Sequence, residues 1–111
     1  MRRLLITGGS GYLGQHLVPR AAELYDVHYT YFHNDPLALP SASRLDLLNR
    51  SAVLRLAEQI RPDAIIHTAG SNRSPNMEAV IVDGTQHIVE AAGLSGARLI
   101  HLSTDVVFDG L

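Results

Sequence analysis

A glycine-rich segment near the N-terminus, Thr-Gly-Gly-Ser-Gly-Tyr-Leu-Gly at residues 7–14, restricts the fold of this chain more than any other feature. Residues 3–7 before it form a short apolar run typical of a buried strand, and residues 11–24 after it have the leucine spacing of a helix. Residues 27–32 are β-branched and aromatic, which favours a second strand. The sequence therefore predicts a strand, a tight glycine turn, a helix and a second strand within about 30 residues.

The glycines of this turn fit a site for the pyrophosphate of a dinucleotide. Gly8 or Gly9 permits the sharp turn, and Gly11 removes the Cβ where a pyrophosphate would approach the backbone. Gly14 lets the helix pack close to the sheet. Free amides and the positive end of the helix dipole can bind phosphate without a lysine, and the chain has none. A glycine turn without a ligand is the alternative. The candidate pyrophosphate-binding residues are Gly8, Ser10, Gly11, Tyr12, Leu13 and Gly14.

Strands and helices alternate along the rest of the chain. This alternation predicts one α/β domain over residues 1–111, with a doubly wound parallel sheet of the Rossmann type in the order 3-2-1-4-5. The ligand should bind at the carboxyl ends of strands 1 and 4, where the winding reverses. The further predicted elements are a very short strand at 44–46, a helix at 51–60 capped by Ser51, a strand at 64–67, a helix at 76–92 ended by Gly93 and Gly96, and a strand at 98–103.

Composition excludes several classes of function. A net charge of −2 and a pI near 6.3 provide no basic surface for nucleic acid or for an anionic membrane. No apolar window is long enough for a membrane span and no signal peptide is present, so we expect a cytoplasmic protein. The absence of cysteine excludes thiolate metal sites, and the six histidines have no i, i+4 spacing that would favour a metal.

The end of the second predicted strand bears on the choice between NAD and NADP. A carboxylate that binds the ribose hydroxyls of NAD usually stands there, but the strand ends in Tyr31-Phe32-His33. Asp35 lies just beyond and is one candidate for that role. His33, with Arg44 as a second candidate, would instead lie near the 2′-phosphate of NADP. On this ground we favour NADP slightly over NAD.

Four segments together resemble the extended short-chain dehydrogenase/reductase family. The Thr-Gly-x-x-Gly-x-x-Gly turn is similar to its cofactor loop, Leu-Asp-Leu-Leu at 45–48 to its short third strand, and residues 61–70 to its fourth strand and small-residue loop. Residues 99–110 resemble the Ser-Thr-Asp-Tyr-Val-Phe-Asp-Gly signature of dTDP-4-dehydrorhamnose reductases. The regulatory β subunit of methionine adenosyltransferase shares that fold and a similar signature. The resemblance covers the whole chain in the same motif order.

The resemblance implies hydride transfer from NAD(P)H to the C4 carbonyl of a dTDP-linked 4-keto-deoxysugar. It implies that Thr104 hydrogen-bonds the substrate oxygen and that Asp46, with Leu47 beside it, meets the adenine edge. It places Thr68, Ala69, Gly70 and Ser103 beside the cofactor. In the family a Tyr-x-x-x-Lys pair donates the proton, because a nearby cation lowers the high pKa of a phenol.

The chain departs from the family at three points. It contains no lysine and ends after the fifth strand, so we expect it to be an N-terminal part that lacks the substrate-binding part and is inactive by itself. Ile81 stands where the family usually has an asparagine, and Val106 replaces the tyrosine of the signature. These two changes favour the alternative, a non-catalytic NAD(P)-binding regulator. The fifth strand would form an uncovered sheet edge, so we expect marginal stability or self-association, for example as a homodimer.

Overall fold

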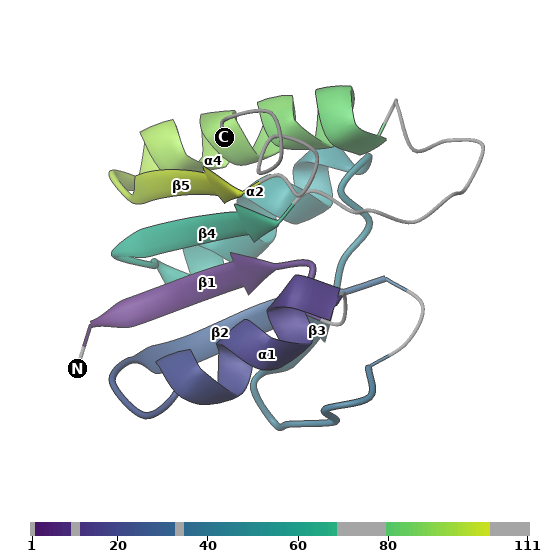
Figure 1. Ribbon diagram of the computed structural model, residues 1–111. Coiled ribbons are helices and arrows are strands. Elements are labelled where there is room, and N and C mark those ends of the chain that lie inside the picture. The colour runs from purple at the N-terminus through teal and green to yellow at the C-terminus, as the bar shows by residue number, and fades with distance from the viewer. Residues whose placement is uncertain (1, 10–11, 33–34, 69–79, 103–111) are drawn as a thin grey trace, which may run out of the picture.

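The chain folds around a parallel sheet. The computed structural model describes residues 2–9, 12–32, 35–68 and 80–102 (Figure 1). All neighbouring strands pair in parallel in the order β3-β2-β1-β4-β5, which confirms the predicted topology. The strands are β1 (Arg3–Thr7), β2 (Asp26–Tyr31), β3 (Ala42–Arg44), β4 (Ala64–Thr68) and β5 (Arg98–Leu102).

Helices cover both faces of the sheet, as expected for a doubly wound fold. Helix α1 lies on the face formed by β1 and β2, whereas α2 and α4 lie side by side on the opposite face (Figure 1). The described helices are α1 (Tyr12–Ala21), α2 (Arg50–Ile60), the π-helical turn η1 (Val80–Gly84) and α4 (Thr85–Ser95).

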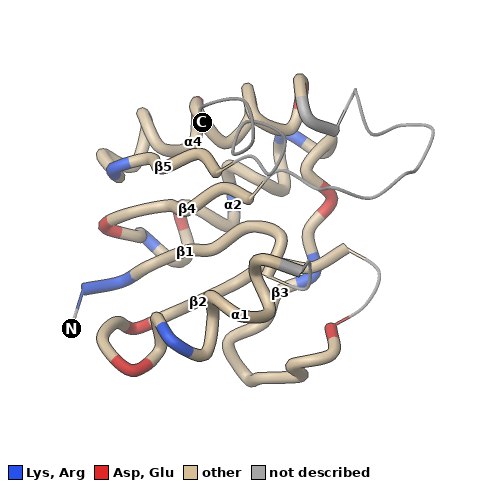
Figure 2. Tube along the Cα trace, viewed as in Figure 1, with Lys and Arg blue, Asp and Glu red and all other residues tan. Residues whose placement is uncertain are grey.

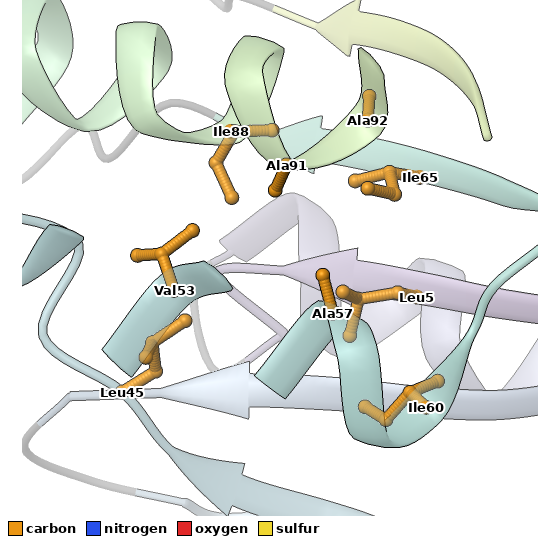
Figure 3. Packing of buried hydrophobic residues seen from close by; sticks show 9 residues of the cluster. All are labelled: Leu5, Leu45, Val53, Ala57, Ile60, Ile65, Ile88, Ala91 and Ala92. Carbon is orange, nitrogen blue, oxygen red and sulfur yellow. The ribbon is translucent and has the colours of Figure 1, made fainter. Parts of the chain in front are cut away.

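Two apolar clusters hold these layers together, because alternate side chains of each strand point to opposite faces. Leu5 and Ile65 face α2 and α4, whereas Leu4 and Ile6 face α1. Figure 3 shows the first cluster between the sheet and its two helices. It consists of Leu5, Leu45, Val53, Ala57, Ile60, Ile65, Ile88, Ala91 and Ala92.

Two helix ends differ from the prediction. Asn49, not Ser51, caps α2: its side chain accepts a hydrogen bond of 3.1 Å from the amide of Ala52. Asparagine and serine are both good N-caps, and Asn49 takes the role because it directly precedes the first helical residue, Arg50. Gly93 lies inside α4, and of the two glycines predicted to end this helix it is Gly96, where φ is 72°, that does so. Glycine tolerates this left-handed conformation, so Gly96 stops the helix.

The bounds of three other elements differ from the prediction by more than one residue. The third strand covers Ala42–Arg44 and not 44–46, so Asp46 lies beyond its end. Helix α1 contains Pro19 and ends at Ala21, earlier than the predicted residue 24. A helix-interior proline removes one backbone donor, which is consistent with this early end. Of the predicted helix at 76–92, residues 76–79 lie outside the described part, and the rest begins as the π-helical turn.

Charge is spread thinly over the fold. In the view of Figure 2, basic and acidic positions are scattered along the trace and do not gather into a block of one sign. Within the described part of the chain, no helix is long and apolar enough to cross a membrane.

Candidate functional site

The glycine turn lies at the carboxyl end of β1, between β2 and β4. Gly8 has φ +73°, and a Cβ built on it would collide with the side chain of Thr68 at the end of β4. The Gly8 amide donates to Thr30 Oγ1 at 3.2 Å, and the Gly9 amide donates to the Thr30 carbonyl at 2.8 Å. The turn is therefore fixed from both sides, and only glycine fits at its first position.

The start of α1 packs directly against this turn. A Cβ built on Gly14 would collide with the carbonyl oxygen of Gly8 and lie 2.6 Å from the Cα of Gly9. The absence of a side chain at Gly14 thus lets α1 pack closely on the glycine turn. The sequence had predicted close packing of the helix on the sheet. Helix α1 begins at Tyr12, with Leu13 half-buried behind it. Its amide end lies beside the turn, and such an end attracts an anion.

A buried histidine joins three elements near this turn. His67 of β4 has its Nδ1 2.5 Å from Thr7 Oγ1 and its Nε2 3.0 Å from Thr85 Oγ1 at the start of α4. Its side chain is almost fully buried, and its ring centroid lies 5.0 Å from that of His101. Burial, and next the nearby His101, lowers the pKa of His67 to about 4. The ring is therefore neutral at pH 7, with one donor and one acceptor nitrogen for the two hydroxyls.

Thr68 links the same two strands one residue later. Its hydroxyl donates to the carbonyl of Thr7 at 2.6 Å, so the hydroxyl is satisfied inside the protein. Thr68 is buried, and its side chain is the one that excludes a Cβ at Gly8. Thr68, which the sequence predicted beside the cofactor, therefore packs behind the glycine turn and supports it.

The segment after β2 is anchored to a buried tyrosine. The ring of Tyr29 is fully buried, and its hydroxyl donates to the Asp35 carboxylate, with oxygens at 2.8 and 3.0 Å. The same hydroxyl accepts from the amide of Leu39 at 3.0 Å. Burial, and also the Asp35 carboxylate, raises the pKa of the Tyr29 phenol, whereas the Leu39 amide opposes the shift. Asp35, one candidate for the ribose contact, is thus directed onto a side chain of the protein.

The two residues expected at the adenine edge lie on the segment after β3. The exposed Asp46 accepts a hydrogen bond of 2.9 Å from the Leu48 amide and so stabilises its own turn. The carbonyl of Leu47 lies 2.7 Å from His87 Nδ1 of α4. A Cβ built on Gly84 would be 3.0 Å from the Leu47 side chain. The π-helical turn and α4 therefore hold this segment in place.

Several predicted site residues lie outside the part of the chain that the structure describes. They include the two predicted signature residues and two of the three residues expected in the small-residue loop. Ile81 lies in η1, whereas Val106 is again outside the described residues. Within the described ranges, no group of three acidic or histidine side chains is placed to hold a metal ion. The undescribed candidates are Ser10, Gly11, His33, Ala69, Gly70, Ser103 and Thr104.

Sequence reasoning missed two residues that shape the site, Thr30 and Tyr29. Both lie at the end of β2, next to the glycine turn. The parallel pairing of β1 with β2 was a usable signal, because it places the last residues of β2 beside the turn that follows β1. Which of them faces the turn depends on register, which the sequence left open.

Known proteins are similar to this chain along nearly its whole length. The sequence pattern of the RmlD substrate binding domain family matches residues 1–111. A dTDP-4-dehydrorhamnose reductase from Mycobacterium tuberculosis is 38% identical over 115 residues, which cover 97% of this chain and 34% of that protein. The methionine adenosyltransferase 2 subunit beta of Xenopus tropicalis is 34% identical over 117 residues, which cover 98% of this chain and 34% of that protein.

A solved structure is also similar to this chain. The crystal structure of a hypothetical dTDP-4-dehydrorhamnose reductase from Sulfolobus tokodaii matches with a TM-score of 0.74 at 26% identity, over 91% of this chain and 38% of that chain. The chain therefore spans about a third of the length of the relatives it matches.

Proposed function

The chain belongs to the RmlD substrate binding domain family, and on that premise we propose that residues 1–111 form the NAD(P)-binding Rossmann domain of a reductase. Its substrate would be a nucleotide-linked 4-keto-deoxysugar, as the name of the 38% identical dTDP-4-dehydrorhamnose reductase indicates. NAD(P)H, when bound, supplies the hydride for the C4 carbonyl. The dinucleotide and, in the whole enzyme, the nucleotide sugar are the proposed partners.

The main support for this proposal is the cradle formed by the glycine turn and the first turn of α1. Glycine at positions 8 and 14 lets the turn close against Thr68 and lets the start of α1 pack on the turn, which brings the free amides of the first helical turn beside it. In our proposal Ser10, Gly11, Tyr12 and Leu13 complete this cradle. In the same proposal, Asp46 and Leu47 contact the adenine, and His33 lies near its ribose. The nicotinamide side is lined by Thr68, Ala69, Gly70 and Ser103. Thr104 hydrogen-bonds the substrate oxygen.

We also propose NADP as the preferred dinucleotide. The carboxylate that could bind the ribose hydroxyls of NAD, that of Asp35, is hydrogen-bonded to Tyr29 instead. A carboxylate at the end of β2 is the usual mark of NAD binding, so its diversion favours NADP.

A non-catalytic regulator is the second candidate. The 34% identical relative named methionine adenosyltransferase 2 subunit beta supports it, and so does Ile81 at a position where an asparagine would be expected in an enzyme. Turnover of a dTDP-linked 4-keto-deoxysugar by a full-length protein with this domain would support the reductase. Dinucleotide binding without any turnover by that protein would support the regulator.

Titration of the chain with NADPH and NADH, followed by nicotinamide fluorescence, tests the proposal directly. We expect saturable binding but no oxidation of NADPH in the presence of the sugar nucleotide, because the chain contains no lysine for a Tyr-x-x-x-Lys pair. The Gly14→Ala variant should lose binding, whereas Gly93→Ala should retain it, since nothing lies within 4 Å of a Cβ at Gly93. Failure of the chain to bind either dinucleotide would refute the proposal.

A further inference from the structure

A histidine of α4, His87, is hydrogen-bonded to the segment that joins β3 to α2. Its Nδ1 lies 2.7 Å from the carbonyl oxygen of Leu47, which is 40 residues away in the sequence. A carbonyl oxygen can only accept a hydrogen bond, so Nδ1 carries the proton and donates it. A neutral ring in this tautomer and a charged ring both have that proton, so the contact does not depend on the charge of the ring.

Two further contacts hold α4 against the same segment. Arg50, the first residue of α2, forms an ion pair with Glu90 of α4, and its Nε lies 2.8 Å from a carboxylate oxygen. Glu90 follows His87 by three residues, so both side chains lie on one face of the helix. Gly84, directly before α4, packs so closely that a Cβ on it would be 3.0 Å from Cβ of Leu47. Helix α4 therefore contacts the segment at its middle and at its end.

The hydrogen bonds within the segment are local. The side chain of Asp46 accepts from the amide of Leu48 at 2.9 Å, and its carbonyl accepts from the amide of Asn49 at 2.9 Å. These two bonds connect near neighbours in the sequence, so they shape the turn after β3 and do not set its distance from α4. The bond from His87 adds a contact with a distant helix to this turn.

Helix α4 is itself connected to the glycine turn. Thr85 Oγ1, two residues before His87, lies 3.0 Å from Nε2 of His67, and Nδ1 of the same ring lies 2.5 Å from Thr7 Oγ1. Thr7 is the last residue of β1, and the glycine turn follows it directly. The first turn of α4 thus links the glycine turn on one side with the segment after β3 on the other.

We propose that His87 is a positioning residue of the dinucleotide site, because it sets the place of the segment after β3 relative to the glycine turn. The inference rests on the proposed function, in which Asp46 and Leu47 contact the adenine and the glycine turn binds the pyrophosphate. One ribose joins these two parts of the dinucleotide, so both contacts form together only when the two protein segments are correctly spaced. His87 acts through the Leu47 carbonyl and does not itself touch the dinucleotide.

The test compares the dissociation constants of NADPH and its hypoxanthine analogue. Adenine has an amino group that donates to an acceptor such as the Asp46 carboxylate, whereas hypoxanthine has a carbonyl oxygen there. We expect the unmodified chain to bind NADPH about fivefold more tightly, as for one hydrogen bond. His87→Leu should weaken NADPH and bring the ratio of the two constants close to one, because the Leu47 carbonyl loses its donor. His87→Gln should restore part of the ratio, because its amide can donate instead.

A second variant displaces the same segment while His87 stays in place. Gly84→Ala puts a methyl group 3.0 Å from Cβ of Leu47, so the segment must move away from α4 and the ratio should fall. Gln86→Ala is the matched control, because Gln86 is exposed on α4 beside His87 and should leave both constants unchanged. Thermal unfolding of each variant shows which of them are folded.

A merely structural role of His87 would lower the stability of His87→Leu and leave the ratio unchanged. An unchanged ratio in folded His87→Leu, or in Gly84→Ala if the leucine variant does not fold, would therefore overturn the proposal and leave the proposed site intact. Equal affinity of the unmodified chain for NADPH and the analogue would overturn it too. A chain that binds neither would refute the proposed function instead.

The ring nitrogens of His87 test the contact without any substitution. In the unmodified chain, ¹⁵N NMR of the neutral ring should show the proton on Nδ1, as the bond to the Leu47 carbonyl requires. A proton on Nε2 of the neutral ring would overturn the proposal.

Discussion

The ring of Tyr29 lies directly beneath Gly9: a Cβ built on Gly9 would be 2.5 Å from Cδ2 of the ring. This contact brings the end of β2 against the turn that follows β1. The same tyrosine hydroxyl holds Asp35 and the amide of Leu39. One buried side chain therefore supports both the glycine turn and the segment that leads to β3.

The Gly9→Ala variant tests the packing of this turn. Its methyl group would overlap the ring of Tyr29, so we expect a loss of about 2 kcal/mol in the free energy of unfolding, as for other overpacked sites. Urea denaturation measures the change. Gly93→Ala is the control and should gain up to about 1 kcal/mol, since Gly93 lies inside α4 with open space around it. Equal stability of Gly9→Ala and the unmodified chain would contradict the contact.

The Tyr29→Phe variant tests the role of the hydroxyl. The ring remains, but Asp35 and the Leu39 amide lose their shared partner. We expect a loss of about 1–2 kcal/mol and faster hydrogen exchange at the Leu39 amide. Tyr25→Phe, at an exposed tyrosine, should change neither quantity. Unaltered exchange at Leu39 in Tyr29→Phe would show that the segment is held in another way.

The buried His67 predicts how stability depends on pH. Its pKa is about 4 in the folded chain, below the ordinary value of 6.5, so between these pH values the unfolded chain binds more protons. This pKa difference therefore contributes about 3 kcal/mol to the free energy of unfolding, and the contribution is fully present above pH 6.5. It is lost as the pH falls from 6.5 toward 4. The loss arises because burial, and next the nearby His101, disfavours the charged imidazolium in the folded chain.

Unfolding measured at several pH values in the chain and in His67→Asn checks this prediction. The variant should show a much shallower fall in stability between pH 6.5 and 4, whatever its stability at pH 7. An NMR titration of the His67 ring gives the pKa directly. A midpoint near 6.5 would contradict the buried, neutral histidine.

The edge of the sheet predicts self-association of the chain. Strand β5 is the last strand of the described sheet, and Ile100 on it is 42% exposed. An uncovered apolar edge strand pairs readily with another copy. Sedimentation at increasing concentration should show dimers or larger species, and Ile100→Lys should reduce them. Leu94→Lys, at an exposed leucine of α4, is the control and should have little effect. A chain that stays monomeric at high concentration would contradict this expectation.

The topology could be predicted from sequence because it depends on features repeated along the chain. Short apolar runs alternate with longer amphipathic ones, and right-handed crossovers leave few arrangements of parallel strands. The first strand, Arg3–Thr7, was predicted at its observed bounds for the same reason. Asn49 and Ser51 show the limit, because two good capping residues lie close together and only packing decides between them.

The details of the site depend on tertiary contacts, which local sequence does not encode. The direction of Asp35 follows from the buried position of Tyr29, and the support of Leu47 follows from His87 and Gly84 far along the chain. The π-helical turn at Val80–Gly84 has no recognised local signal, yet it places Gly84 against Leu47. Sequence thus located the edge at which the candidate site lies but not the side chains that shape it.

In our proposal, the glycine turn and the start of α1 bind the dinucleotide. The most direct measurement is an NMR titration of the isotopically labelled chain with NADPH. We expect saturable shifts that are largest at the amides of Gly8, Gly9, Leu13 and Gly14, with small shifts at the opposite edge, at Arg3 and Asp63. Absence of shifts at these four amides under saturating NADPH, or shifts concentrated elsewhere, would contradict it.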